Sequence, residues 1–186
     1  MILGSLLREL GGPELSLVDS ITDWFAWNDI KMPRIRRIAE GILDIVKLQK
    51  ELGDKGYELK DLYRYYLDNF GEEKALEKLL ERLMGIREMG EKKAITFLRG
   101  YSVRSGEKLP IEKLSLPRER HVQRVMKRIG FVDDEDIEKI REAGCKYFKV
   151  PIIADLGLWF VGKNYCYEDK PKCEECPVEE YCAKNI

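Results

Sequence analysis

The feature that most constrains this chain is a group of four cysteines near its C-terminal end. They lie between residues 166 and 182 in the pattern C-x6-C-x2-C-x5-C. Gaps this short allow one loop to direct four sulfurs at a single centre, and thiolates are the usual ligands of iron–sulfur clusters and structural zinc. The pattern therefore predicts a ligand set made of Cys166, Cys173, Cys176 and Cys182.

Three kinds of cross-link compete for these cysteines. Disulfides are disfavoured because the opening residues, MILGSLLREL, lack the features of a signal peptide, and because 186 residues are enough to bury a core. Zinc sites more often use two C-x2-C pairs, whereas this chain has one. We expect an iron–sulfur cluster, with zinc and disulfides as the alternatives.

The cysteine spacing resembles the [4Fe–4S] loop of the endonuclease III and adenine-glycosylase branch of DNA repair enzymes. That resemblance implies a [4Fe–4S] cofactor at the end of a helical DNA glycosylase. It also implies that basic residues between the first two cysteines contact DNA phosphates, and that the end of the preceding helix lies close to DNA. The matching residues here are Lys163, Lys170 and Lys172.

Hydrophobic spacing indicates an all-α fold, because apolar residues recur every three to four positions and no strand-like alternation appears. Proline, glycine and aspartate residues mark the ends of these segments. We predict a helical bundle, with a helix-hairpin-helix at 79–99 and other helices near 13–27, 33–48, 59–70, 72–83, 134–148 and 152–163.

Several side chains on these helices are assigned to packing or capping. Asp133 or Asp134 is expected to cap the helix that follows, and the helix at 152–163 is expected to be buried because it is apolar nearly all round. The remaining residues predicted to be buried are Trp24, Trp27, Tyr63, Tyr65, Tyr66 and Cys145.

Charge is distributed unevenly along the chain. The whole chain has a net charge of −1, but residues 86–130 contain twelve Lys or Arg against five Glu, a net charge of +7. A charge run of this kind is usually a solvated face, but this stretch is where a contact with a polyanion would be sought. No apolar run is long enough to cross a membrane, and we expect an intracellular protein, a cytoplasmic and nucleoid-associated prokaryotic monomer.

Residues 84–99 predict a helix, a turn containing glycine and a second helix. The run MGEKKAITFLR resembles the second half of the helix-hairpin-helix of the DNA glycosylase superfamily, most closely its archaeal and bacterial 8-oxoguanine branch. The resemblance places Lys92 on the catalytic lysine, with Lys93 as the adjacent alternative. We also expect Arg87, Met89 and Gly90 to contact DNA. Glu88 stands where the family usually has the first glycine of the hairpin.

A lysine suits this chemistry because its free amine can attack the sugar C1′, displace the base and hold the sugar as a Schiff base. Partial burial and neighbouring positive charge would lower its pKa and favour that amine. Elimination from the Schiff base then cuts the strand. The resemblance therefore implies glycosylase activity with AP-lyase activity, and Lys92 as its nucleophile.

The segment 116–125 resembles the family pattern V-D-x-H-V-x-R-V. Glu119 stands at the position of the catalytic aspartate, while His121, Arg124 and Val125 match the flanking positions. A carboxylate beside C1′ stabilises positive charge in the transition state and helps to take a proton from lysine or water. Glutamate supplies that charge on a longer stem. We assign His121 a structural hydrogen bond at a helix start.

The motifs together indicate a base-excision DNA glycosylase and AP lyase that acts on duplex DNA carrying a damaged base or an abasic site. We divide the chain into a helical region, 1–130, and a C-terminal region, 131–186, with the cluster loop. Because Glu88 and Glu119 depart from the family pattern, one alternative is an iron–sulfur DNA-binding protein that does not remove bases. A more distant alternative is an electron carrier.

Overall fold

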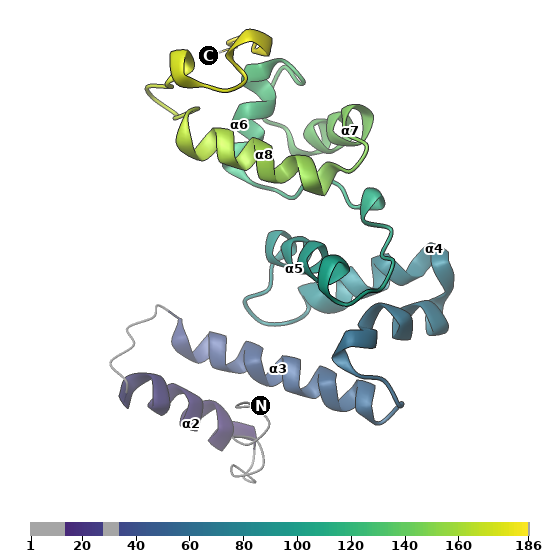
Figure 1. Ribbon diagram of the computed structural model, residues 1–186. Helices are drawn as coiled ribbons and strands as arrows, with labels where there is room; N and C mark the ends of the chain where they lie inside the picture. Colours follow the sequence, from purple (N-terminus) through teal and green to yellow (C-terminus); the bar gives the residue numbers. More distant parts are fainter. Residues whose placement is uncertain (1–13, 28–33, 186) are drawn as a thin grey trace. The chain divides into compact units, whose positions relative to one another are not determined.

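The computed structural model describes residues 14–27 and 34–185, and its regular structure over those residues is entirely helical (Figure 1). The predicted all-α fold is therefore confirmed. The α-helices of the described residues are α2 (Glu14–Trp27), α3 (Ile35–Gly53), α4 (Leu62–Met84), α5 (Glu91–Arg104), α6 (Arg120–Ile129), α7 (Ile137–Tyr147) and α8 (Pro151–Asn164). Short 3-10 turns are η1 (Leu59–Asp61), η2 (Ile111–Lys113), η3 (Cys173–Glu175) and η4 (Glu179–Tyr181).

The chain forms two compact units, which we name unit 1 (Met1–Gly90) and unit 2 (Glu91–Ile186). Helix α6 ends at Ile129 and packs against both α7 and α8. Residues on the two sides of our predicted division at 130 thus belong to the same compact unit. The hairpin predicted at 79–99 spans the boundary between units, with α4 in unit 1 and α5 in unit 2.

Unit 1 contains α2, α3 and α4, with α2 packed alongside α3 (Figure 1). Its buried side chains include Leu48, Leu52, Leu79 and Leu83, which recur at helical spacing on α3 and α4. On α3, Gly41 lies directly against the turn after α4, where an added Cβ would be 2.5 Å from the carbonyl oxygen of Arg87. A glycine is therefore needed at this contact.

Helix α4 consists of two helical segments joined at Gly71. That residue has a φ of 74° and a ψ of 168°, which lie outside the helical region and favour glycine. The two segments agree with the separate helices predicted on either side of residue 71. The predicted packing of the three tyrosines on the first segment is confirmed, because all are at most 6% exposed: Tyr63, Tyr65 and Tyr66.

The predicted packing of the two tryptophans has a different outcome. Trp27, the last residue of α2, is 92% exposed, so its assignment to the core was wrong. Three-residue spacing places Trp24 and Trp27 on nearby faces of one helix, but it does not say that a partner helix reaches the final turn. The side chain of Trp24 lies outside the described residues.

Unit 2 is built around one apolar core to which α6, α7 and α8 all contribute. Its residues are Leu116, Val122, Val125, Met126, Ile140, Ala143, Leu158 and Val161. Helices α6 and α8 lie side by side, and α8 also packs against α5. This arrangement connects the N-terminal end of α6 to α8, which runs directly into the cysteine loop.

Three sequence predictions in unit 2 require correction. The cap of α7 is Asp136, whose carboxylate accepts backbone N–H bonds at 3.0 and 3.1 Å, whereas Asp134 instead bonds to the N–H of Asp136. Cys145 is exposed because it lies on the outer face of α7. Helix α8 is not buried all round: one face leaves three side chains roughly half exposed, Ile153, Leu156 and Phe160.

No helix in the described parts of the chain is both long enough and apolar enough to cross a membrane.

Candidate functional site

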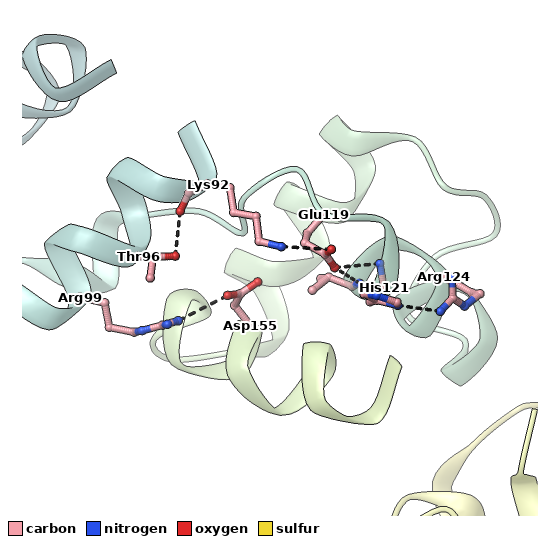
Figure 2. Close-up of polar contacts among 8 residues, drawn as sticks. Lys92, Thr96, Arg99, Glu119, His121, Arg124 and Asp155 are labelled. Atoms are coloured by element: carbon pink, nitrogen blue, oxygen red, sulfur yellow. Dashed lines mark hydrogen bonds and ion pairs between the residues drawn. The ribbon is translucent and has the colours of Figure 1, made fainter. Parts of the chain in front are cut away.

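The two residues assigned to catalysis lie together in unit 2. Lys92, in the first turn of α5, places its Nζ 3.1 Å from Oε1 of Glu119, the residue that precedes α6 (Figure 2). The lysine side chain is 44% exposed, whereas the Glu119 side chain is 12% exposed. The amine is therefore open to solvent while its partner carboxylate is held inside the unit.

Glu119 is fixed because it is the N-cap of α6. Its Oε2 accepts hydrogen bonds from the backbone N–H groups of His121 at 2.8 Å and Val122 at 3.2 Å (Figure 2). These N–H groups have no partner within the helix, and the positive end of the helix dipole favours a carboxylate here. The same residue thus begins the helix and holds a negative charge beside Lys92.

These contacts determine the ionisation of Glu119. Burial raises the pKa of its carboxyl, but the hydrogen bonds from Lys92 and from the N–H of Val122 outweigh that effect, helped by the charges of Lys92 and His121. The net result is a pKa below the usual value of 4.5. Glu119 is therefore a stable anion at neutral pH and a poor proton acceptor.

The surroundings of Lys92 differ from our expectation. We expected neighbouring positive charge to favour its free amine, but the residue in contact with Nζ is an acid, Glu119. Only a free amine can attack a carbon, so a lysine that acts as the nucleophile needs a group that removes its proton.

A second carboxylate, Asp155 on α8, lies in the same region and was not identified from the sequence. It is 6% exposed, and its Oδ2 is 3.4 Å from Nη1 of Arg99 on α5 (Figure 2). Burial raises the pKa of Asp155, the charges of Arg99 and Lys92 lower it, and the charge of Glu119 raises it. The signal in the sequence was an aspartate within an otherwise apolar helix.

Arg124 joins the start of α6 to the end of α8. Its buried guanidinium donates to the carbonyl oxygens of Cys166 at 2.8 Å and Gly162 at 3.1 Å, and contacts Nδ1 of His121 at 2.8 Å. Gly162 packs so closely on His121 that an added Cβ would lie 2.6 Å from the histidine Cβ. His121 therefore has the structural hydrogen bond that we assigned to it.

The four cysteines of the predicted ligand set line one pocket at the end of unit 2. All are free thiols of intermediate burial. Apolar side chains from α6, α8 and the loop complete its wall: Val125, Ile129, Val161 and Val178. Among the described residues, no three His, Cys, Asp or Glu side chains form a group that could hold a single metal ion.

Two of these thiols have an N–H donor close to the sulfur. Nη1 of Arg128 is 3.6 Å from Sγ of Cys166, and the backbone N–H of Lys184 is 3.4 Å from Sγ of Cys182. Arg128 also donates to the carbonyl oxygens of Tyr167 and Glu168 at 2.5 and 2.8 Å, which ties the loop to α6. Four free thiols around one apolar pocket, with N–H donors aimed at sulfur, fit the ligand set of a [4Fe–4S] cluster.

The turn before α5 retains the backbone shape that a glycine would provide. Glu88 has a φ of 62°, in the left-handed region, and its side chain pairs with Arg37 at 2.8 Å and Arg34 at 3.6 Å. These ion pairs hold a glutamate in a conformation that costs a non-glycine residue about 1–2 kcal/mol. Glutamate in place of glycine at position 88 therefore changes the side chain of the turn but keeps its left-handed backbone conformation.

The residues predicted to contact DNA fall in both units. In unit 1, Arg87 is exposed and pairs with Glu40 at 3.3 Å, Met89 is half-buried and Gly90 is exposed. In unit 2 the three exposed residues are Lys163, Lys170 and Lys172. The ammonium of Lys163 lies over the ring of Trp159, and Lys172 is 3.9 Å from Glu175.

A scan against protein-family models and a search of curated proteins gave no match to this sequence.

Proposed function

We propose that this protein is a base-excision DNA glycosylase with AP-lyase activity. The observation that carries the proposal is the pair of Lys92 Nζ and Glu119 Oε1 at 3.1 Å, with the amine exposed and the carboxylate fixed at a helix start. A nucleophile beside an anion is what displacement of a base from C1′ requires. The resemblance of both motifs to the helix-hairpin-helix glycosylases supports the same conclusion.

In the proposed reaction the amine of Lys92 attacks C1′ and the base departs. Glu119, anionic at neutral pH, stabilises the positive charge that develops on the sugar as the base leaves. Loss of the ring oxygen bond gives a Schiff base between Lys92 and the open sugar, and β-elimination then breaks the 3′ phosphate bond. The damaged base and its mispairing would favour extrusion of the nucleotide from the duplex.

We further propose that the four cysteines hold a [4Fe–4S] cluster as a structural centre. When bound, the cluster would supply four metal–thiolate bonds that cross-link the loop. Arg128 and Arg124 hold the same loop on α6 through carbonyl oxygens, and the exposed ammonium groups of Lys170 and Lys172 are available to phosphates. The loop is thus proposed to dock DNA rather than to take part in the reaction.

The proposal is tested by borohydride trapping on a duplex that carries an abasic site, and on duplexes with a range of oxidised or mispaired bases. We expect a covalent adduct with the wild type and none with Lys92→Ala. Lys93→Ala is the matched control, because it removes the adjacent lysine of the same helix turn and should leave trapping intact. Duplex binding by fluorescence anisotropy is measured for each variant.

The outcomes separate the alternatives. Binding without any adduct would favour the non-enzymatic DNA-binding protein. An adduct that persists in Lys92→Ala would exclude Lys92 as the nucleophile. Absence of duplex binding at low salt would contradict both functions. Iron and acid-labile sulfide analysis tests the cofactor separately, and stoichiometric zinc without iron would contradict the cluster.

A further inference from the structure

Asp155 is a buried acid with an incomplete set of partners. Its Oδ2 faces Arg99, but its Oδ1 is buried and has no hydrogen-bond partner among the described residues. A buried carboxylate oxygen without a partner costs stability, about 1–3 kcal/mol for an unsatisfied polar group. A buried aspartate that bears such a cost calls for an explanation of that oxygen.

The carboxylate of Asp155 lies within the electrostatic reach of the Lys92–Glu119 pair. The charged groups that act on it come from two of the elements that pack against α8: Arg99 and Lys92 from α5, and Glu119 from the start of α6. Figure 2 shows the Asp155 side chain rising from α8 towards the space between Lys92 and Arg99. Asp155 and these three residues therefore form one cluster within unit 2.

The two carboxylates in this cluster have opposite environments. Glu119 accepts three donors, from Lys92 and two backbone N–H groups, and the hydrogen bonds from Lys92 and from the N–H of Val122 lower its pKa. Burial raises the pKa of Asp155, and its one cationic partner, Arg99, only partly offsets that effect. When the pKa values of two acids in one site are shifted in opposite directions, the acid with the lowered pKa remains an anion and the acid with the raised pKa exchanges protons.

We propose that Asp155 is the proton acceptor of this site, taking from the Lys92 ammonium, directly or through one water, the proton that it must lose before attack. The inference rests on the proposed function, because it assumes that Lys92 is the nucleophile. The two carboxylates then have separate roles: Glu119 stabilises positive charge on the sugar, and Asp155 accepts the lysine proton on its unpartnered Oδ1.

The proton balance on an abasic site is complete without a further reactant. The Lys92 ammonium transfers a proton to the Asp155 carboxylate, which leaves a neutral amine and a neutral acid. The amine electron pair forms a bond to C1′ of the open aldehyde, and the carbonyl oxygen becomes a hydroxyl by taking the proton that the nitrogen releases. Asp155 then returns its proton to that hydroxyl, which leaves as water and gives the protonated Schiff base.

The test is the rate of borohydride trapping on an abasic duplex as a function of pH, measured in single turnover for wild type and Asp155→Asn. We expect Asp155→Asn to bind the duplex like the wild type but to react at least about 10-fold more slowly near pH 7. The deficit should shrink towards about pH 9, as solvent begins to remove the lysine proton. Asp133→Asn, which changes an exposed carboxylate of the same unit, should match the wild type.

The pH dependence separates proton transfer from a structural role. A deficit of Asp155→Asn that is the same at every pH, or no deficit, would overturn the inference while leaving Lys92 as nucleophile. Absence of any adduct with the wild type would instead defeat the proposed function. If circular dichroism shows that Asp155→Asn does not fold, Arg99→Gln is the test variant. Because it removes the cation that lowers the pKa of Asp155, it should move the acidic limb of the pH–rate profile to higher pH. An acidic limb at the wild-type pH would overturn the inference.

Discussion

Replacing Glu119 with alanine should weaken unit 2 by an amount that follows from its contacts. The variant loses the N-cap of α6, two backbone hydrogen bonds that are together worth about 1 kcal/mol. It also loses the ion pair with Lys92, which contributes no more than about 0.5 kcal/mol because the lysine side chain is 44% exposed and screened by solvent. The expected loss of unfolding free energy is about 1–1.5 kcal/mol near neutral pH.

Part of this loss should depend on pH. The pKa of Glu119 in the folded protein lies below 4.5, the usual value, so its ionised form stabilises the fold. The stabilisation is fully present above about pH 4.5 and is lost as the pH falls through the folded-state pKa. The difference between the wild type and Glu119→Ala should therefore narrow as the pH is lowered below 4.5.

Urea unfolding followed by circular dichroism measures this difference at each pH. Glu112→Ala, which removes an exposed carboxylate on η2, is the matched control and should change stability little at any pH. A gap between the wild type and Glu119→Ala that stays constant from pH 7 to below 4.5 would refute the reasoning. So would a wild-type-like stability of Glu119→Ala at neutral pH, because the cap would then contribute nothing.

Three further predictions concern the turn, the helix contact and the DNA surface. At position 88, glycine should be more stable than alanine by about 1 kcal/mol in thermal unfolding, because the φ of 62° disfavours residues with a Cβ; a more stable Glu88→Ala would contradict this. Gly162→Ala should lower the unfolding free energy by about 1–3 kcal/mol, because its Cβ meets His121, whereas Gly157→Ala, where a Cβ meets open space, should be neutral or stabilising. Lys170→Ala with Lys172→Ala should make the dependence of duplex binding on log salt shallower by roughly 1–2, and an unchanged slope would remove these lysines from the phosphate contacts.

Much of the fold was predictable because its signals are local. Helical periodicity and glycine or proline punctuation identified the helices, including the break at Gly71. The predictions that Trp27, Cys145 and all faces of α8 are buried were wrong, because burial depends on which helix packs on which face. Periodicity identifies an apolar face, but it does not identify a partner for that face.

The candidate site was predictable only where a motif carried it. Lys92, Glu119 and the four cysteines were found through spacing that resembles a family, and the structure brings the first two into contact and the cysteines around one pocket. Asp155 belongs to no such motif, and Arg99, the last residue of the run MGEKKAITFLR, was given no role, because their contact comes from the packing of α8 against α5. The positive φ of Glu88 could also not be predicted from the sequence, because glutamate rarely adopts that conformation.

The identity of the lysine that forms the Schiff base is the most direct measure of the proposed chemistry. We would trap the wild type on an abasic duplex with borohydride, digest the adduct with protease and nuclease, and locate the sugar remnant by mass spectrometry. The remnant should be on Lys92. A remnant on Lys93 or another lysine, or no adduct at a protein concentration that saturates the duplex, would contradict the assignment of Lys92 and Glu119 as the reacting pair.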